Sequence, residues 1–396
     1  MAVVFGLISS FVFTYFQPRF EKLLYPEDEP VVTIPQDDIV ETEEPEATQE
    51  TETQTTEAAT EDTEVTPPEA WEIEPEDYQK LQNKLYDVGR EANRFVVTVT
   101  AVKSDTDWFN NAYESKGQAS GIIIADNGKE LLIMTERKVI SDAQEIFVTF
   151  VNETTAAAVM KKYDGNTGIA VLSVPLENID EETMQEITVA ALGNSLSVPQ
   201  GMVVIAVGSP LGTNYSILTG NITSTVKDVS TTDNNYTVLT TNIVGSSNGS
   251  GAIINVAGEV IGLVMQDYIA AGDRSTLTAL SISDLKATIE MLSNNQDIPY
   301  IGLKLTTVTN EISKEYDIPK GAYVKEIKMD SPAMAAGLQN GDVITKMNGE
   351  PVYTVEGYES KLLKLLPEEN IVIVVQRQGA EGYIEIACDV EISILQ

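Results

Sequence analysis

Histidine is absent from this 396-residue chain. Imidazole is the most frequent general base near neutral pH and a leading metal ligand in proteins. Its absence excludes every reaction scheme that depends on it. We expect neither a metal ion nor any other cofactor in this protein.

Cysteine and basic residues are also scarce. The single cysteine, Cys388, excludes an intrachain disulfide and a thiolate metal cluster. It lies in an alternating, strand-like run, so we expect it in a core or at a sheet edge. Lys and Arg number 25 against 61 Asp and Glu, which leaves a net charge of −36. A chain this acidic repels phosphate backbones, so we expect no nucleic-acid partner.

Long hydrophobic runs are rare, and the most apolar stretch lies at the start of the chain. Residues 2–16 are nearly all apolar or small, although a helix of this length is short for a hydrocarbon core of about 30 Å. A cleaved signal peptide is the competing interpretation, but a basic n-region and a clear small-x-small cleavage site are missing. We predict a single-pass membrane anchor over residues 1–22. Arg19 and Lys22 follow the apolar run and leave the orientation open.

An acidic, low-complexity segment comes next. No Lys or Arg occurs between Leu23 and Gln79, where Glu, Asp and Thr dominate. Such a segment cannot bury enough apolar surface to offset the entropy lost on ordering. We predict a disordered, self-repelling linker over residues 23–76.

The next domain, residues 77–297, shows a β pattern between two helical ones. Residues 77–93 have helical spacing, and residues 281–294 begin with Ser and Asp as N-caps before apolar residues at helical spacing. Between residues 95 and 266, short strand-like runs alternate with Gly, Asn and Asp turns. This alternation is typical of a β-barrel or a β-sandwich.

The last domain, residues 298–396, carries a specific motif. Residues 331–338 (SPAMAAGL) are followed by Gly-Asp-Val-Ile at 341–344 and by Asn348-Gly349. This order predicts a short helix, a glycine turn, a strand and a tight turn. It resembles the PDZ domains attached to bacterial proteases.

The PDZ resemblance implies a peptide-binding site. Tyr300, Ile301, Gly302 and Leu303 match the carboxylate-binding loop of these domains, whose backbone N–H groups hold a peptide C-terminus. Residues 355–366 would form the helix on the other side of the groove. The implied partners are protein C-termini or unfolded polypeptides.

The central domain resembles the HtrA/Deg family of trypsin-like proteases. The resemblance lies in four segments, whose order and spacing, followed by a PDZ domain, carry the match: 191–195 (ALGNS), 203–212 (VVIAVGSPLG), 218–224 (LTGNITS) and 254–262 (INVAGEVIG). It implies a mainly β chain with a trypsin-like double β-barrel. It also implies a body outside the cytoplasm and a homotrimer as one oligomeric form.

Two catalytic positions of that family hold unsuitable residues. The family's histidine lies in a T-N-x-H-V-like run, which here is TERKV at residues 135–139 and places Lys138 at the histidine. The family's aspartate precedes a strand that here begins at Ile169, so Gly168 stands at that position. Asp164 lies nearby in a turn-like sequence, and we expect only a turn role for it.

The nucleophile position admits two alignments. Counting back from Asn255 without a gap places Gly249 at the serine, whereas counting forward from Thr241 with a later deletion places Ser250 there. Both alignments lack the base and the carboxylate that orients it. A serine hydroxyl without a base is a weak nucleophile, so we expect no catalytic residue in this domain.

Three hypotheses for the function follow from these patterns. The first is a membrane-tethered, inactive protease homologue that binds peptides or unfolded envelope proteins through its PDZ domain and barrels. The second is an active serine endopeptidase with a Ser–Lys dyad, in which Lys138 would be the base and Ser250, Ser247 or Ser246 the nucleophile. The third is a regulatory subunit that assembles with active relatives.

Overall fold

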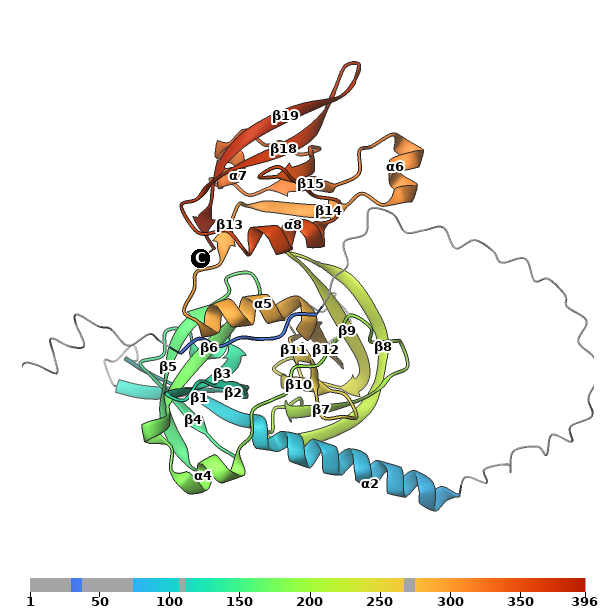
Figure 1. Cartoon of the computed structure of the whole chain (residues 1–396). Helices are drawn as coiled ribbons and strands as arrows, with labels where there is room; N and C mark the ends of the chain where they lie inside the picture. The colour runs from blue at the N-terminus through green and yellow to red at the C-terminus, as the bar shows by residue number, and fades with distance from the viewer. Residues whose placement is uncertain (1–29, 38–73, 107–111, 267–274, 396) are drawn as a thin grey trace, which may run out of the picture.

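The computed structural model describes residues 30–37, 74–106, 112–266 and 275–395. It is mainly β, with two closed six-stranded barrels followed by a smaller β domain, and this architecture confirms the predicted fold class. Figure 1 shows the two barrels side by side with the small domain above them. Within the described ranges no helix is long and apolar enough to cross a membrane. The predicted anchor over residues 1–22 lies outside these ranges.

The first barrel has the strand order β1-β2-β3-β6-β5-β4. All strands contribute buried side chains to its core, and those of the strand pair β3 and β6 are almost all buried. These two strands read as continuous apolar runs because one face fills the barrel and the other is covered by neighbouring elements. The strands are β1 (Val96–Thr106), β2 (Ala112–Asp126), β3 (Glu130–Glu136), β4 (Glu145–Thr149), β5 (Thr155–Tyr163) and β6 (Ile169–Pro175).

The second barrel has the order β10-β11-β12-β9-β8-β7. All five residues of β10 and of β11 are buried. Two long strands, β8 and β9, form a hairpin that extends from this barrel to the small domain (Figure 1). The strands are β7 (Val203–Ser209), β8 (Ser216–Ser230), β9 (Asn235–Val244), β10 (Ser250–Ile254), β11 (Val260–Val264) and β12 (Thr276–Ser281).

Helices flank the barrels where the apolar spacing predicted them. Helix α2 (Pro75–Ala92) leads into the first barrel, and helix α5 (Ile282–Ser293) closes the second. Leu285, Ile289 and Leu292 of α5 are buried, which is the expected result of an apolar stripe with a helical period. The short helices are η1 (Asn93–Phe95), α3 (Arg137–Ile140), η2 (Leu176–Asn178) and α4 (Glu181–Glu186).

The small domain has a six-stranded sheet, a separate two-stranded sheet and three helices. The larger sheet has the order β14-β15-β16-β18-β19, with β17 paired to β16, and β13 pairs separately with β20. Cys388 is buried in its core, as expected. The strands are β13 (Pro299–Tyr300), β14 (Leu303–Thr307), β15 (Ala322–Ile327), β16 (Val343–Met347), β17 (Glu350–Pro351), β18 (Asn370–Gly379), β19 (Gly382–Glu391) and β20 (Ser393–Ile394). The helices are α6 (Asn310–Tyr316), α7 (Pro332–Ala335) and α8 (Val355–Leu362), the last of which ends four residues before the predicted boundary.

Residues 30–37 correct the prediction of a disordered linker over residues 23–76. This segment packs against α5, with Val32 and Ile34 buried in the main core. Its backbone forms two hydrogen bonds at the C-terminal end of α5. Val32 N–H donates to Oδ1 of Asn294, the residue after the helix, at 2.8 Å, and Ile34 N–H donates to Glu290 Oε2 in the helix at 2.7 Å. Because the surrounding sequence is acidic and of low complexity, the burial of Val32 and Ile34 could not be predicted from composition. Residues 23–29 and 38–73 of the predicted linker lie outside the described ranges, and Pro75 and Glu76 belong to helix α2 rather than to a linker.

Candidate functional site: the barrel cleft and the PDZ loop

The loop before β10 forms a tight turn at the predicted nucleophile position. Gly249 N–H donates to the Ser246 carbonyl at 2.8 Å, and Ser246 N–H donates to the Pro210 carbonyl at 2.9 Å. A trypsin-like site uses the N–H of its nucleophilic residue to stabilise the oxyanion. With Gly249 at that position, the corresponding N–H is engaged inside the loop. A side chain on Gly249 would also place its Cβ 2.7 Å from the Pro210 carbonyl oxygen.

Ser250 is the first residue of β10 and lies in the seam between the barrels. Its side chain is buried, with 3% of the residue exposed. Its Oγ accepts a hydrogen bond of 2.9 Å from Ser120 N–H on β2. The Ser120 hydroxyl in turn donates to Asn214 Oδ1 at 2.8 Å. The Ser250 hydroxyl is therefore held by the neighbouring barrel and is shielded from solvent.

Lys138 lies on α3, directly after β3. Its Nζ is 2.6 Å from Glu136 Oε2, and Glu136 is buried. An adjacent carboxylate favours the protonated ammonium, whereas a lysine base must be able to lose its proton. Arg137, beside it, stacks over the Tyr163 ring at 3.9 Å from the ring centroid. The local environment is an ion pair with a stacked guanidinium.

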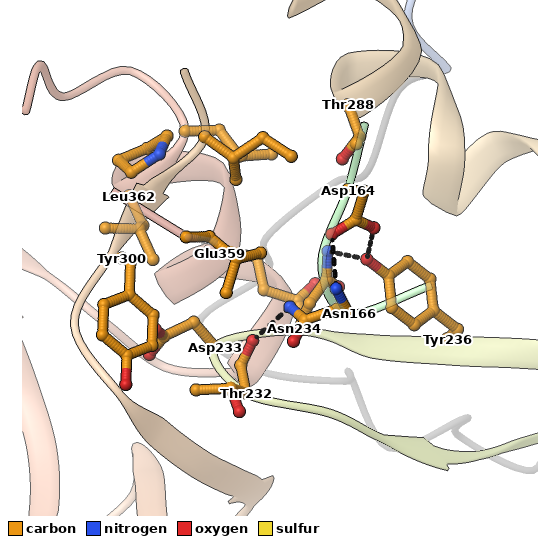
Figure 2. A pocket seen from close by; sticks show the side chains of 14 residues that line it. Asp164, Asn166, Thr232, Asp233, Asn234, Tyr236, Thr288, Tyr300, Glu359 and Leu362 are labelled. Atoms are coloured by element: carbon orange, nitrogen blue, oxygen red, sulfur yellow. Dashed lines mark hydrogen bonds between the residues drawn. The ribbon is translucent and has the colours of Figure 1, made fainter. Parts of the chain in front are cut away.

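Gly168 and Asp164 belong to one turn before β6. Gly168 has φ +75°, in the left-handed region that favours glycine, and its carbonyl accepts from Arg137 N–H at 2.7 Å. Asp164 is buried, and its carboxylate accepts from Asn166 N–H at 2.9 Å and from the Thr167 hydroxyl at 2.5 Å. Burial raises the pKa of Asp164, and these hydrogen bonds oppose the rise. Its closest partners belong to its own turn, and the Tyr236 hydroxyl of β9 also donates to Oδ2 at 3.5 Å (Figure 2).

The predicted carboxylate-binding loop lies at the junction with the second barrel. Ile301 and Gly302 donate their N–H groups to Asp233 Oδ2 at 2.8 and 2.7 Å. Leu303 N–H donates to Asp233 Oδ1 at 3.0 Å, and the Tyr358 hydroxyl on α8 donates to the same oxygen at 2.8 Å. Asp233 lies between β8 and β9, so the barrel hairpin supplies a carboxylate to this loop.

The space left at this junction is small. A crevice of about 20 Å³ lies between hairpin, loop and α8, which is enough for about one water molecule. Figure 2 shows Asp233, Tyr300 and Glu359 lining this crevice. In the part of the chain that the structure describes, no group of three or more Cys, Asp or Glu side chains is placed to hold a metal ion.

Acidic side chains surround the same junction. Glu359 of α8 accepts from Asn235 N–H at 2.6 Å, and Asp284 of α5 accepts from Thr237 N–H at 2.7 Å. Lys227 on β8 forms an ion pair with Glu356 of α8 at 2.8 Å. Burial is the largest cause that raises the pKa of Glu359 to about 8. Three carboxylates and one lysine thus lie between the barrel and the small domain.

Comparison with known proteins assigns both domains. Residues 119–263 match the trypsin-like peptidase domain family, and residues 299–388 match the PDZ domain family. The serine protease Do-like HtrB of Bacillus subtilis is 30% identical over 280 residues, which cover 66% of this chain and 59% of that protein. The serine protease Do-like HtrA of Lactobacillus helveticus is 26% identical over 289 residues, or 69% of this chain and 68% of that protein. The chain is therefore similar, in both domains and in their order, to serine proteases named HtrA and DegP.

Solved HtrA-type structures share the fold of this chain. The protease AlgW, solved with a decapeptide, superposes with a TM-score of 0.58 at 19% identity, covering 78% of this chain and 98% of that one. A serine endoprotease from Yersinia pestis superposes with a TM-score of 0.53 at 23% identity. The chain spans about three fifths of the Bacillus relative.

The contact between the barrel and the PDZ domain is expected to weaken as the pH rises from about 5 to about 8. Below pH 4.5 the Glu359 carboxyl is neutral in both the docked and the separated state. Between its ordinary pKa of 4.5 and its docked pKa of about 8, only the separated state loses the proton, so docking loses stability. Asp284 also has a raised pKa and acts in the same direction, whereas the lowered pKa of Glu356 acts below this window.

The measurement is the thermal unfolding midpoint of the full chain between pH 5 and pH 8. Glu359→Gln keeps the shape of the side chain and removes its titration, so the variant should show a smaller decrease than the parent chain. An equal decrease in both proteins would contradict the assignment to Glu359.

Asp233 is the residue that sequence reasoning missed. Its segment, TTDNN at residues 231–235, signals only a turn. Asp233 has φ +62°, a left-handed conformation that Asp tolerates better than most residues. A turn signal carries no information on where its side chain points in the folded protein, so only the structure places this carboxylate in the PDZ loop.

Proposed function

We propose that this chain is a catalytically silent HtrA-type protein that binds peptide C-termini through its PDZ domain, with the barrels as a scaffold. The observation that carries the proposal is the arrangement at the loop before β10. Gly249 N–H is engaged with Ser246, and the Ser250 hydroxyl is buried against Ser120. The absence of histidine from the sequence points the same way.

Loss of the triad removes most of the rate acceleration of such a site. The remaining acceleration of roughly 10³–10⁴ over water in a trypsin-like enzyme comes from the oxyanion hole and substrate binding. Here the Gly249 N–H already donates to the Ser246 carbonyl. We therefore expect the residual acceleration from the oxyanion hole to be lost as well. A Ser–Lys dyad is disfavoured because the partner of Lys138 is the carboxylate of Glu136.

Peptide capture rests on the PDZ loop. Ile301, Gly302 and Leu303 already direct their N–H groups at a carboxylate. Strand β14 lies at the end of the sheet order, which leaves an edge to which a peptide strand can be added. The AlgW structures are described as complexes with a decapeptide and a tripeptide.

We place the body of the protein outside the cytoplasm, because relatives from Halomonas elongata and Hahella chejuensis are named as probable periplasmic DegP-like endoproteases. Protease added to spheroplasts, in which any outer membrane has been opened, is expected to digest the PDZ domain, and protection of that domain would contradict this placement. A membrane tether, a homotrimer and assembly with active relatives stay predictions.

The full chain is expected to leave fluorescein-labelled, unfolded casein uncleaved. Release of soluble fluorescence would be followed over hours, with the Bacillus HtrB relative as the positive control. Ser250→Ala serves as the control for contaminating protease and should match the parent chain. Cleavage by the parent chain that disappears in Ser250→Ala would show that the protein is an enzyme with a different base.

A further inference from the structure

The hydrogen bonds to the Asp233 carboxylate are those that a PDZ loop would form with a bound peptide carboxylate. Four donors converge on its two oxygens: three consecutive backbone N–H groups and the Tyr358 hydroxyl, at 2.7 to 3.0 Å. Asp233 itself is buried. An ionised carboxylate is stable in such a place only because its oxygens are fully hydrogen-bonded.

The backbone around Asp233 also follows the edge of the PDZ sheet. Asp233 N–H donates to the Leu303 carbonyl at 2.6 Å, and the Asn235 side-chain amide donates to the Leu305 carbonyl at 3.2 Å. Leu303 and Leu305 both belong to β14, whose only partner in the described sheet is β15. The hairpin therefore occupies both features that a peptide would use, the carboxylate loop and the start of the strand edge.

We infer that Asp233 is an internal ligand of the PDZ domain, which holds the β8–β9 hairpin in the groove until a peptide with a free C-terminal carboxylate displaces it. This inference rests on the proposed peptide-binding function and adds its regulation. An incoming α-carboxylate takes the same N–H donors, so the two carboxylates exclude one another. A peptide whose C-terminus is an amide lacks the competing group.

Two factors determine whether Asp233 or a peptide carboxylate occupies the loop: the burial of the carboxylate, and the pairing that a peptide gains along β14. Burial raises the pKa of Asp233, although the hydrogen bonds from Gly302, Ile301 and Tyr358 oppose this. A peptide recovers the same hydrogen bonds and gains further pairing along β14. Its apparent affinity is the intrinsic affinity reduced by the fraction of molecules in which the hairpin has left the loop.

The test compares the full chain with Asp233→Ala. The probe is a fluorescent peptide library with its last four residues randomised, prepared with a free carboxylate and with a C-terminal amide. Asp233→Ala is expected to bind the carboxylate library at least about tenfold more tightly than the parent chain does, because the competent fraction rises. Tyr358→Phe removes one donor from Asp233 but also one from the incoming carboxylate, so its gain should be smaller. Thr232→Ala, in the same loop, should match the parent chain.

Hydrogen exchange at Ile301, Gly302 and Leu303 gives a second measurement that needs no peptide. These N–H groups are expected to be protected in the parent chain and to exchange faster in Asp233→Ala, whose barrel amides should keep their protection. Measurable peptide binding with equal affinity in both proteins, or equal exchange at the three amides, would overturn the inference. Faster exchange without any peptide binding would uphold Asp233 as the internal ligand and refute peptide capture as the function.

Discussion

Replacing Asp342 with alanine is expected to destabilise the PDZ domain by about 1–3 kcal/mol, because it removes the buried acceptor of several hydrogen bonds while the Arg377 guanidinium is partly exposed. Asp342 is 1% exposed. Arg377 Nε and Nη2 donate to its two oxygens at 2.7 and 2.8 Å, and Gln339 N–H donates to Oδ2 at 2.8 Å. The alanine leaves the guanidinium and one N–H without these partners. It also loosens the turn after α7, because Arg377 donates in addition to the Gly337 carbonyl.

The effect should be confined to the domain that contains Asp342. Native-state hydrogen exchange of the full chain separates the domains, since the β18 amides report on the PDZ domain and the β3 amides on the first barrel. The matched control is Glu385→Ala, which removes an exposed ion pair with Lys346 at 3.9 Å and should change stability by less than about 1 kcal/mol. Similar losses from Asp342→Ala and Glu385→Ala would show that the buried pair has no special role.

The domain architecture could be predicted because its signals are local. Apolar runs such as Leu131–Met134 form strands that stay buried on both faces, and α5 keeps a helical apolar spacing over its whole length. Glycine turns such as Asn348-Gly349 mark the hairpin between β16 and β17. Each of these patterns requires information from only a few neighbouring residues.

The functional junction could not be predicted because it depends on distant partners. Asp233 is about 70 residues from the PDZ loop in sequence, and its segment shows only turn composition. The burial of Ser250 likewise depends on Ser120, which lies 130 residues earlier. The two alignments at Gly249 and Ser250 are equal in sequence, and the environment of each residue emerges only once β10 is placed against β7 and β2.

Replacing Asp37 with alanine is expected to destabilise the barrel domain by about 3–5 kcal/mol. Lys286 of α5 is 3% exposed, and its Nζ lies 2.8 Å from both oxygens of Asp37. The alanine leaves a buried ammonium without that carboxylate. The free energy of unfolding of the full chain would be measured with urea, and exchange of the α5 amides would locate the loss.

Two further variants separate the charge from the packing at this contact. Asp87→Ala removes an exposed ion pair with Arg90 at 2.6 Å and should change stability by less than about 1 kcal/mol. Asp37→Ala combined with Lys286→Met replaces the isolated ammonium with an apolar side chain of similar length. If the loss in Asp37→Ala comes from the unpaired charge, the double variant should recover most of it, because a buried pair can often be replaced by apolar residues at little cost. A double variant as unstable as Asp37→Ala would instead assign the loss to detachment of residues 30–37 from α5.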